Sequence, residues 1–227
     1  MEAQGKAYYF GILYPFQDQV LEIITRLDTG FHLTGGTAAS RGYLQHRFSD
    51  DLDLFVNDDD RFGLWAERIV QVLAQHVGWR TEILLRQERF LRLTLTSEAG
   101  LLKVELVNDV PSRVGEPWLH PTLGRLDTAE NILANKVSAL IDREEPKDLA
   151  DIWGFCCRKG LALNEAITGA QGKAAGIFPA DLARLLCTAT ETDWQVIRWV
   201  EAPEPECFVA DLQRLGEGLI LTEDNVD

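Results

Sequence analysis

The pattern of apolar and polar positions predicts that the first half of the chain alternates between helix and strand. Residues 15–27 place apolar side chains three and four positions apart, and the aspartates at 58–60 precede a second helical run that reaches His76. Five runs have strand character: 31–34, 51–56, 81–85, 89–96 and 101–107. Short polar segments join the last three, so we expect them to form an antiparallel meander.

The second half of the chain is predicted to be helical. Strand periodicity ends near residue 115, and Gly115, Pro117, Pro121 and Gly124 mark a linker or cap-like loop. Helical spacing returns at 128–142 and 146–158, and more weakly at 162–170, 179–190, 193–201 and 206–215. We therefore expect an α+β protein with an α/β core at residues 1–115 and a helical C-terminal lobe at 116–227.

Composition and charge exclude some classes of function. The chain has 227 residues, 46% of them hydrophobic, which is enough to bury a core. Its formal charge is −14, and residues 114–227 carry 20 acidic side chains against 10 basic ones. This balance repels polyanions and disfavours a protein that coats DNA or RNA. A phosphate-bearing ligand must therefore be held by local cations or by a metal ion.

Cysteine and histidine spacings predict no zinc site. The four cysteines form no CxxC pair, and we expect them to be reduced. No apolar stretch approaches the roughly 18 residues of a membrane span, and the N-terminal residues lack the features of a signal peptide. These observations predict a soluble cytoplasmic protein without a membrane partner.

The segment 51–56 alternates carboxylates with apolar side chains. In a strand, Asp51 and Asp53 therefore project from one face, while Leu52 and Leu54 point into the core. Two unit charges about 5 Å apart repel by ~3 kcal/mol at an effective dielectric constant near 20. A divalent cation removes this repulsion, and Mg²⁺ prefers carboxylate oxygens. The strand is thus a candidate metal site.

Glu105 is a third candidate ligand, because it is the one acidic residue in the run 101–107. If its strand lies beside that of Asp51 and Asp53, the three carboxylates are suited to two metal ions about 3.5–4 Å apart, as in nucleotidyl displacement. Arg92 and Lys103 would then flank the site as candidates for phosphate contacts. A solvated sheet face would show the same pattern, so that alternative stays open.

A Gly-Gly-Thr turn lies upstream of the acidic strand. Gly35 and Gly36 let the backbone approach a phosphate closely, and a short helix over 38–44 would add amide donors. Thr37 and Ser49 supply hydroxyl groups nearby in the sequence. A tight turn without a ligand is the alternative reading of these residues.

The Gly-Gly turn followed by an Asp-x-Asp strand resembles the nucleotidyltransferase superfamily with the polymerase-beta-like fold. More narrowly, residues 35–55 resemble the AbiEii/AbiGii toxin family through the step His46-Arg47-Phe48-Ser49. A second match lies in residues 129–155, where a helical lysine is followed by an arginine and an Asp-x-x-Asp pair: Lys136, Arg143, Asp148 and Asp151. Two motifs in this order are more specific than either alone.

The resemblance implies a metal-dependent enzyme that transfers NMP from an NTP to an acceptor hydroxyl. It implies a polymerase-beta-like lobe with a mixed or antiparallel sheet, a pair of Mg²⁺ ions, tRNA as a candidate acceptor and a cognate antitoxin protein as partner. The implied catalytic residues are Asp51, Asp53, Glu105, Lys136, Asp148 and Asp151, with the first three as metal ligands. The implied nucleotide-binding residues are Gly35, Gly36, Thr37, Arg47, Ser49, Lys136 and Arg143.

Three readings of the aspartate pair stay open at this level. Asp148 and Asp151 either position the acceptor, hold Lys136 and Arg143 in place, or form ordinary surface salt bridges.

Alternatives to an enzyme that modifies tRNA also stay open. The acidic balance makes a large RNA footprint less favourable, so a small hydroxylated acceptor, as in antibiotic-modifying relatives, is the second candidate. The third candidate function is that of a non-catalytic domain that binds a nucleotide or a partner protein.

Overall fold

The computed structural model describes residues 2–223, which divide into two compact units. Unit 1 comprises the residues up to Ala38, Ser49–Pro111 and Pro117–Asp127, and unit 2 comprises Ala39–Phe48, Ser112–Glu116 and the residues from Thr128 onward. This division differs from a single boundary between residues 115 and 116. Residues 39–48 group with the helical unit, and residues 117–127 group with the sheet.

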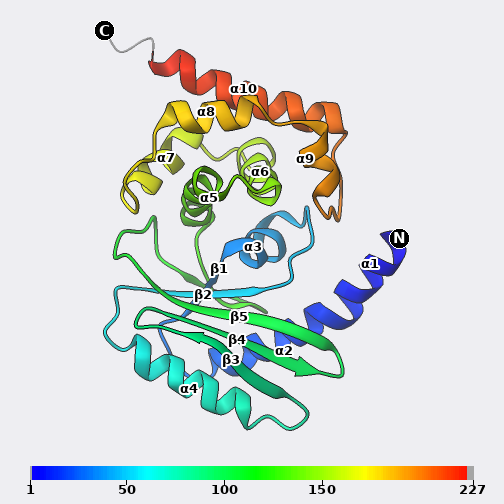
Figure 1. The fold of residues 1–227 in the computed structure, drawn as a ribbon, viewed down its shortest axis with the longest axis vertical. Helices are drawn as coiled ribbons and strands as arrows, with labels where there is room; N and C mark the ends of the chain where they lie inside the picture. Colours follow the sequence, from blue (N-terminus) through cyan, green and yellow to red (C-terminus); the bar gives the residue numbers. More distant parts are fainter. Residues whose placement is uncertain (1, 224–227) are drawn as a thin grey trace. The chain divides into compact units, whose positions relative to one another are not determined.

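Unit 1 contains a seven-stranded mixed sheet with the order β3-β4-β5-β2-β1-β7-β6 (Figure 1). The strands are β1 (His32–Thr34), β2 (Leu52–Asn57), β3 (Arg80–Arg86), β4 (Phe90–Ser97), β5 (Gly100–Asp109), β6 (Trp118–His120) and β7 (Gly124–Leu126). Strands β3, β4 and β5 form the expected antiparallel meander. Strand β5 lies parallel to β2, so the two strands that carry candidate acids are direct neighbours.

The prediction of a linker or cap-like loop at residues 115–124 is partly wrong, because two short strands interrupt the loop. Strands β6 and β7 form an antiparallel hairpin, and β7 pairs in parallel with β1. Each strand has three residues, which is too short to display a period of two. Gly124 has a φ of +72°, a conformation that glycine adopts without strain, so the residue that signalled a loop begins β7.

Helices α2 (Tyr14–Thr25) and α4 (Phe62–Ala74) lie on one face of the sheet (Figure 1). Both were expected from helical spacing. The chain begins with α1 (Glu2–Tyr8) and a π-helical turn, Tyr9–Leu13, which the spacing did not predict. This segment contains two glycines, which have low helix propensity, and several of its apolar side chains are exposed.

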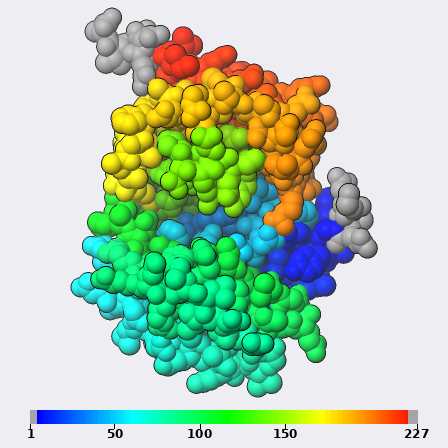
Figure 2. Space-filling model, in the orientation of Figure 1, coloured from blue at the N-terminus to red at the C-terminus, as the bar shows by residue number. Residues whose placement is uncertain are grey.

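Strand β3 is an edge of the sheet, and most of its side chains are exposed. In Figure 2 the teal and green atoms of the 80–109 segment lie on the visible surface of unit 1. By contrast, the side chains of β2 alternate between buried and half-buried along the strand. The core of unit 1 therefore lies against the face to which Leu52, Leu54 and Val56 point.

Unit 2 consists mainly of helices. They are α5 (Ala129–Arg143), α6 (Pro146–Trp153), α7 (Leu163–Gln171), α8 (Pro179–Cys187), α9 (Glu191–Val196) and α10 (Pro205–Glu223). The hydroxyl of Thr128 accepts a hydrogen bond from the amide of Asn131 and caps α5, and Pro146 occupies the first turn of α6. Between residues 2 and 223, no helix combines the length and apolar character needed to cross a membrane.

The helix expected over 193–201 is partly wrong, because α9 ends at Val196. The next residues pair with the segment before β2 instead. The amide of Phe48 donates to the carbonyl of Arg198 (2.8 Å), and the amide of Val200 donates to the carbonyl of His46 (2.8 Å). These hydrogen bonds between distant segments replace helical ones, and local periodicity does not register them.

Candidate active site

Three carboxylates lie on one face of neighbouring strands in unit 1. Asp53 on β2 is the register partner of Glu105 on β5, and Asp51 immediately precedes β2. The intervening Leu52 and Leu54 are 0% and 2% exposed, whereas the acidic positions are half-buried. We call Asp51, Asp53 and Glu105 the carboxylate row. The pairing of β2 with β5 brings these acids onto adjacent positions of one sheet face.

Two cationic side chains contact the carboxylate row. The Nζ of Lys103 lies 2.8 Å from Oδ2 of Asp51 and 3.2 Å from Oε1 of Glu105. The Nε of Arg92, on β4, donates to the same Glu105 oxygen at 2.8 Å. Partial burial alone would lower the pKa of Lys103, but the two carboxylates outweigh it and raise the pKa above its ordinary value. The row is thus partly neutralised by the sheet itself.

The Gly35 turn lies directly against Asp53. Gly35 has a φ of +66°, and a Cβ at this position would lie 2.2 Å from Oδ2 of Asp53. The chain then enters a short helical turn, Gly35–Thr37, which continues as a π-helical segment, Ala38–Leu44. Glycine is therefore required at this position for two reasons: its left-handed backbone conformation, and the side chain of Asp53, which occupies the space a Cβ would need.

We expect Gly35→Ala to displace Asp53 as well as strain the turn. Gly78→Ala is the matched control, since Gly78 has a φ of +87° and a Cβ there would meet no atom within 4 Å. The free energy of unfolding of the control should fall by about 1–2 kcal/mol, the cost of placing alanine in a left-handed conformation. In urea denaturation, Gly35→Ala should show a larger fall in the free energy of unfolding, and it should also lose nucleotidyl transfer. Equal losses of stability in both variants, with transfer retained, would contradict this reading.

The two hydroxyls expected to bind phosphates are buried in unit 1. Thr37 is fully buried, its hydroxyl donates to the carbonyl of Asp51, and its Oγ1 lies 3.0 Å from Oγ of Ser49. Ser49 is 7% exposed. These contacts tie the glycine turn to the start of the acidic strand. Gly35 and Gly36 remain half-buried, so their backbone is the more accessible part of the turn.

Sequence reasoning missed the residues that support the segment before β2. Gln17 on α2 is fully buried, and its Nε2 donates to the carbonyl of Asp50 at 2.8 Å and to that of Ser49 at 3.3 Å. The hydroxyl of Tyr9 donates to Oδ1 of Asp50 at 2.5 Å. A signal for Gln17 existed in the sequence, because this amide lies on the apolar stripe with Val20 and Ile24.

The donor chemistry of the carboxylate row fits a divalent cation. Its members are hard oxygen ligands on adjacent strands, and the missing Cβ of Gly35 leaves room for the backbone beside Asp53. Among the residues that the structure describes, no three acidic, histidine or cysteine side chains are grouped around one point as metal ligands. Asp51 and Glu105 contact the ammonium of Lys103 instead.

Unit 2 contains a buried ion network around the second predicted motif. The Nζ of Lys136, on α5, lies 2.8 Å from Oδ1 of Asp148 and 2.6 Å from Oδ2 of Asp151, both on α6. The two aspartates are 0% exposed, and the lysine is 4% exposed. Arg143 donates two hydrogen bonds to Asp148, at 2.8 and 2.9 Å, from a half-exposed position.

Asp151 is the centre of this network. Arg47 binds it through two parallel hydrogen bonds of 2.7 Å, and Nε2 of His46 lies 3.0 Å from its Oδ1. Burial alone would raise the pKa of Asp151, but the charges of Arg47 and Lys136 hold it well below its usual range. Burial lowers the pKa of His46, whose Nδ1 has no hydrogen-bond partner within residues 2–223.

The geometry of the network bears on the roles expected for its members. Asp148 and Asp151 contact Lys136 directly and are enclosed, which favours the reading that they hold Lys136 and Arg143 over contact with an acceptor. A surface salt bridge is excluded for both aspartates by their burial. Arg47 is likewise engaged with Asp151, so its guanidinium is part of the network. Among the cationic side chains Arg47, Lys136 and Arg143 of this network, that of Arg143 is the most exposed.

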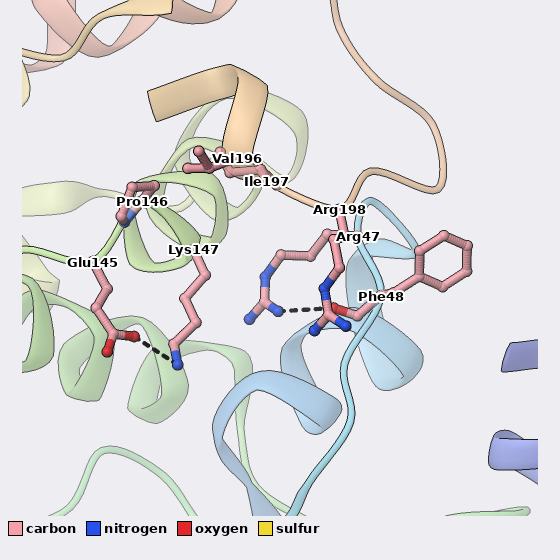
Figure 3. Close-up of a pocket in the computed structure, with 8 residues that line it drawn as sticks. All are labelled: Arg47, Phe48, Glu145, Pro146, Lys147, Val196, Ile197 and Arg198. Carbon is pink, nitrogen blue, oxygen red and sulfur yellow. Dashed lines mark hydrogen bonds and ion pairs between the residues drawn. The ribbon is translucent and has the colours of Figure 1, made fainter. Parts of the chain in front are cut away.

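A pocket of about 210 Å³ lies in unit 2 beside Arg47 (Figure 3). Its lining is Arg47, Phe48, Glu145, Pro146, Lys147, Val196, Ile197 and Arg198. Lys147 and Glu145 form an ion pair at 2.6 Å, and the guanidinium of Arg47 donates to the carbonyl of Phe48 at 3.0 Å. The pocket thus has three cationic side chains against one carboxylate, opposite in sign to the charge of the whole chain.

Comparisons with solved structures bear on the fold. MenT4, the nucleotidyltransferase toxin Rv2826c from Mycobacterium tuberculosis H37Rv, is 16% identical with a TM-score of 0.66, over 100% of this chain and 90% of that chain. JHP933 from Helicobacter pylori is 18% identical with a TM-score of 0.61, over 92% and 90% of the two chains. These likenesses confirm the expected fold class. None of the curated proteins compared with the chain matches it.

A family model settles the relationship at the level of sequence. The model of the nucleotidyl transferase AbiEii toxin, type IV toxin–antitoxin system, matches residues 21–168. That range is well over half of the 227 residues, and it contains the Gly35 turn, the carboxylate row and the whole of the buried ion network. The chain therefore belongs to the AbiEii family of nucleotidyltransferase toxins.

Proposed function

We propose that this nucleotidyltransferase uses a divalent metal ion to transfer NMP from an NTP to an acceptor hydroxyl, with release of pyrophosphate. The observation that carries the proposal is the carboxylate row, in which Asp53 and Glu105 are cross-strand partners beside the Gly35 turn. Metal ions held by such carboxylates supply charge neutralisation for an in-line displacement at phosphorus.

The residues of unit 1 hold and orient the reacting groups in this proposal. Asp51, Asp53 and Glu105 are the metal ligands, and Glu105 also accepts the proton of the acceptor hydroxyl. The oxygen of that hydroxyl forms a bond to the α-phosphorus while the bond to the pyrophosphate oxygen breaks. The backbone of Gly35 and Gly36 approaches the phosphates, because glycine leaves this part of the turn uncovered.

The residues of unit 2 bind and position the nucleotide in this proposal. Lys136 and Arg143 contact its phosphates, as a compact cation and as a planar fork respectively. Asp148 and Asp151 hold these cations, with Arg47 and His46 as the outer support of Asp151. Because Lys136 is buried and already paired, Arg143 makes the first contact.

For the acceptor, we propose the hydroxyl at the acceptor end of tRNA, together with a cognate antitoxin protein as partner. The type IV toxin–antitoxin family supports the toxin role. A small hydroxylated acceptor is the second candidate, and the net charge of −14 favours it because a large RNA footprint needs a basic surface.

The test is incubation of the purified chain with Mg²⁺ and each α-labelled NTP, with and without total tRNA. We expect label to enter RNA and pyrophosphate to form in equal amount, and chelation of the metal to stop both. Pyrophosphate release with a small hydroxylated compound, and none with tRNA, would select the second acceptor class. Nucleotide binding without transfer to any acceptor would contradict the proposal and favour a non-catalytic domain.

A further inference from the structure

Lys103 occupies an unusual position within the carboxylate row. It lies on β5 two residues before Glu105, so both side chains point to the same face of the sheet. Its Nζ bridges Asp51 (2.8 Å), which immediately precedes β2, and Glu105 (3.2 Å), which lies on β5. A single ammonium group therefore contacts two of the three carboxylates proposed to bind metal.

An ammonium group and a metal ion compete for the same oxygens. Both are attracted by the charge of the carboxylates, and an oxygen that accepts a hydrogen bond from Nζ at this distance is less available to a metal ion. Resting on the proposed metal-dependent function, we propose that Lys103 is a tethered counter-cation that a divalent metal ion must displace from Asp51 and Glu105. It thereby sets the metal concentration at which the site fills.

Lys103 is better suited to this exchange than Arg92. The lysine side chain is 35% exposed and ends in a strongly hydrated point charge on a flexible stem, so the displaced ammonium can return to water. Arg92 contacts Glu105 through Nε, and its guanidinium lies over the ring of Phe90 with 5.3 Å between Cζ and the ring centroid. Its contact can persist while Lys103 moves.

The test is a titration of the full chain with Mn²⁺ in the absence of nucleotide. Binding is measured as the loss of the EPR signal of the free ion. Lys103→Met removes the charge and keeps the length of the side chain, and Lys103→Arg keeps a charge. Lys147→Met is the matched control, because Lys147 is also a partly exposed lysine in an ion pair, at 2.6 Å from Glu145 in unit 2. Asp53→Asn identifies the portion of binding that belongs to the carboxylate row.

We expect Lys103→Met to bind Mn²⁺ about five- to thirtyfold more tightly than the natural chain, the factor that corresponds to loss of one or two partly exposed ion pairs. Lys147→Met should bind as the natural chain does, and Lys103→Arg should stay within about threefold of it. Circular dichroism should show that each variant is folded.

The outcomes separate this inference from the proposed function. Binding that Asp53→Asn abolishes, but that Lys103→Met leaves unchanged or weakens, would overturn the counter-cation role and leave the metal site intact. An equal gain in Lys147→Met would also overturn it, because the effect would then arise from net charge. Absence of Asp53-dependent binding in the natural chain and in Lys103→Met would remove the metal site and the inference together.

Discussion

Asp53→Asn should reduce nucleotidyl transfer by about 10²–10³-fold or more, the loss seen when one group that stabilises transition-state charge is removed. The carboxamide keeps the shape of the side chain, but it removes the charge at the centre of the carboxylate row, where Asp53 is the register partner of Glu105. The measurement is the initial rate of label transfer at saturating NTP and Mg²⁺, with the acceptor that supports turnover.

Asp60→Asn is the matched control for this loss. Asp60 is an exposed residue in the turn that follows β2, so the same chemical change is made seven residues away. We expect its transfer rate and its urea midpoint to equal those of the natural chain. If Asp53→Asn retains transfer within about tenfold of the control, the carboxylate row is not where charge is stabilised.

Asp151→Asn should have the largest effect on stability. Asp151 is fully buried and contacts three basic side chains, those of His46, Arg47 and Lys136. An amide of the same size leaves Arg47 and Lys136 buried with less compensating charge, and removal of one partner of a buried pair typically destabilises by about 3–5 kcal/mol. Urea denaturation, followed by tryptophan emission and circular dichroism, measures the change.

Asp142→Asn controls for the loss of one negative charge from unit 2. Asp142 is exposed near the C-terminal end of α5, where an acidic side chain interacts unfavourably with the helix dipole. We expect a change within about 0.5 kcal/mol, in the direction of greater stability if any. If the two variants unfold at the same urea concentration, the contacts of Asp151 in the buried ion network do not stabilise the fold.

Periodicity identified the elements with enough residues to repeat. The expected strands at 89–96 and 101–107 became β4 and β5, and the helix at 128–142 became α5. The hairpin of β6 and β7 was missed because each strand has three residues, and the end of α9 was misplaced because Val200 pairs with His46 across the chain. Hydrogen bonds between distant segments leave no local pattern.

The candidate site divides in the same way. Alternation along 51–56 and 101–107 was enough to select Asp51, Asp53 and Glu105 as residues on polar strand faces. The proximity of Asp53 to Glu105 follows from the parallel pairing of β2 and β5, since residues about fifty positions apart meet through the order of strands in the sheet. Lys103 gained its place between two carboxylates from that same register.

Residue types and their spacing were sufficient to place the candidate acids on polar strand faces, because alternation along a strand is local geometry. The family was reached through the resemblance of two motifs to known ones. Burial was not accessible at that level. Lys136 and Asp151 are charged residues that a linear pattern places on a helix surface, yet they are enclosed in unit 2 with Arg47. Burial of a charge depends on partners that arrive from distant segments, and folding alone brings those partners together.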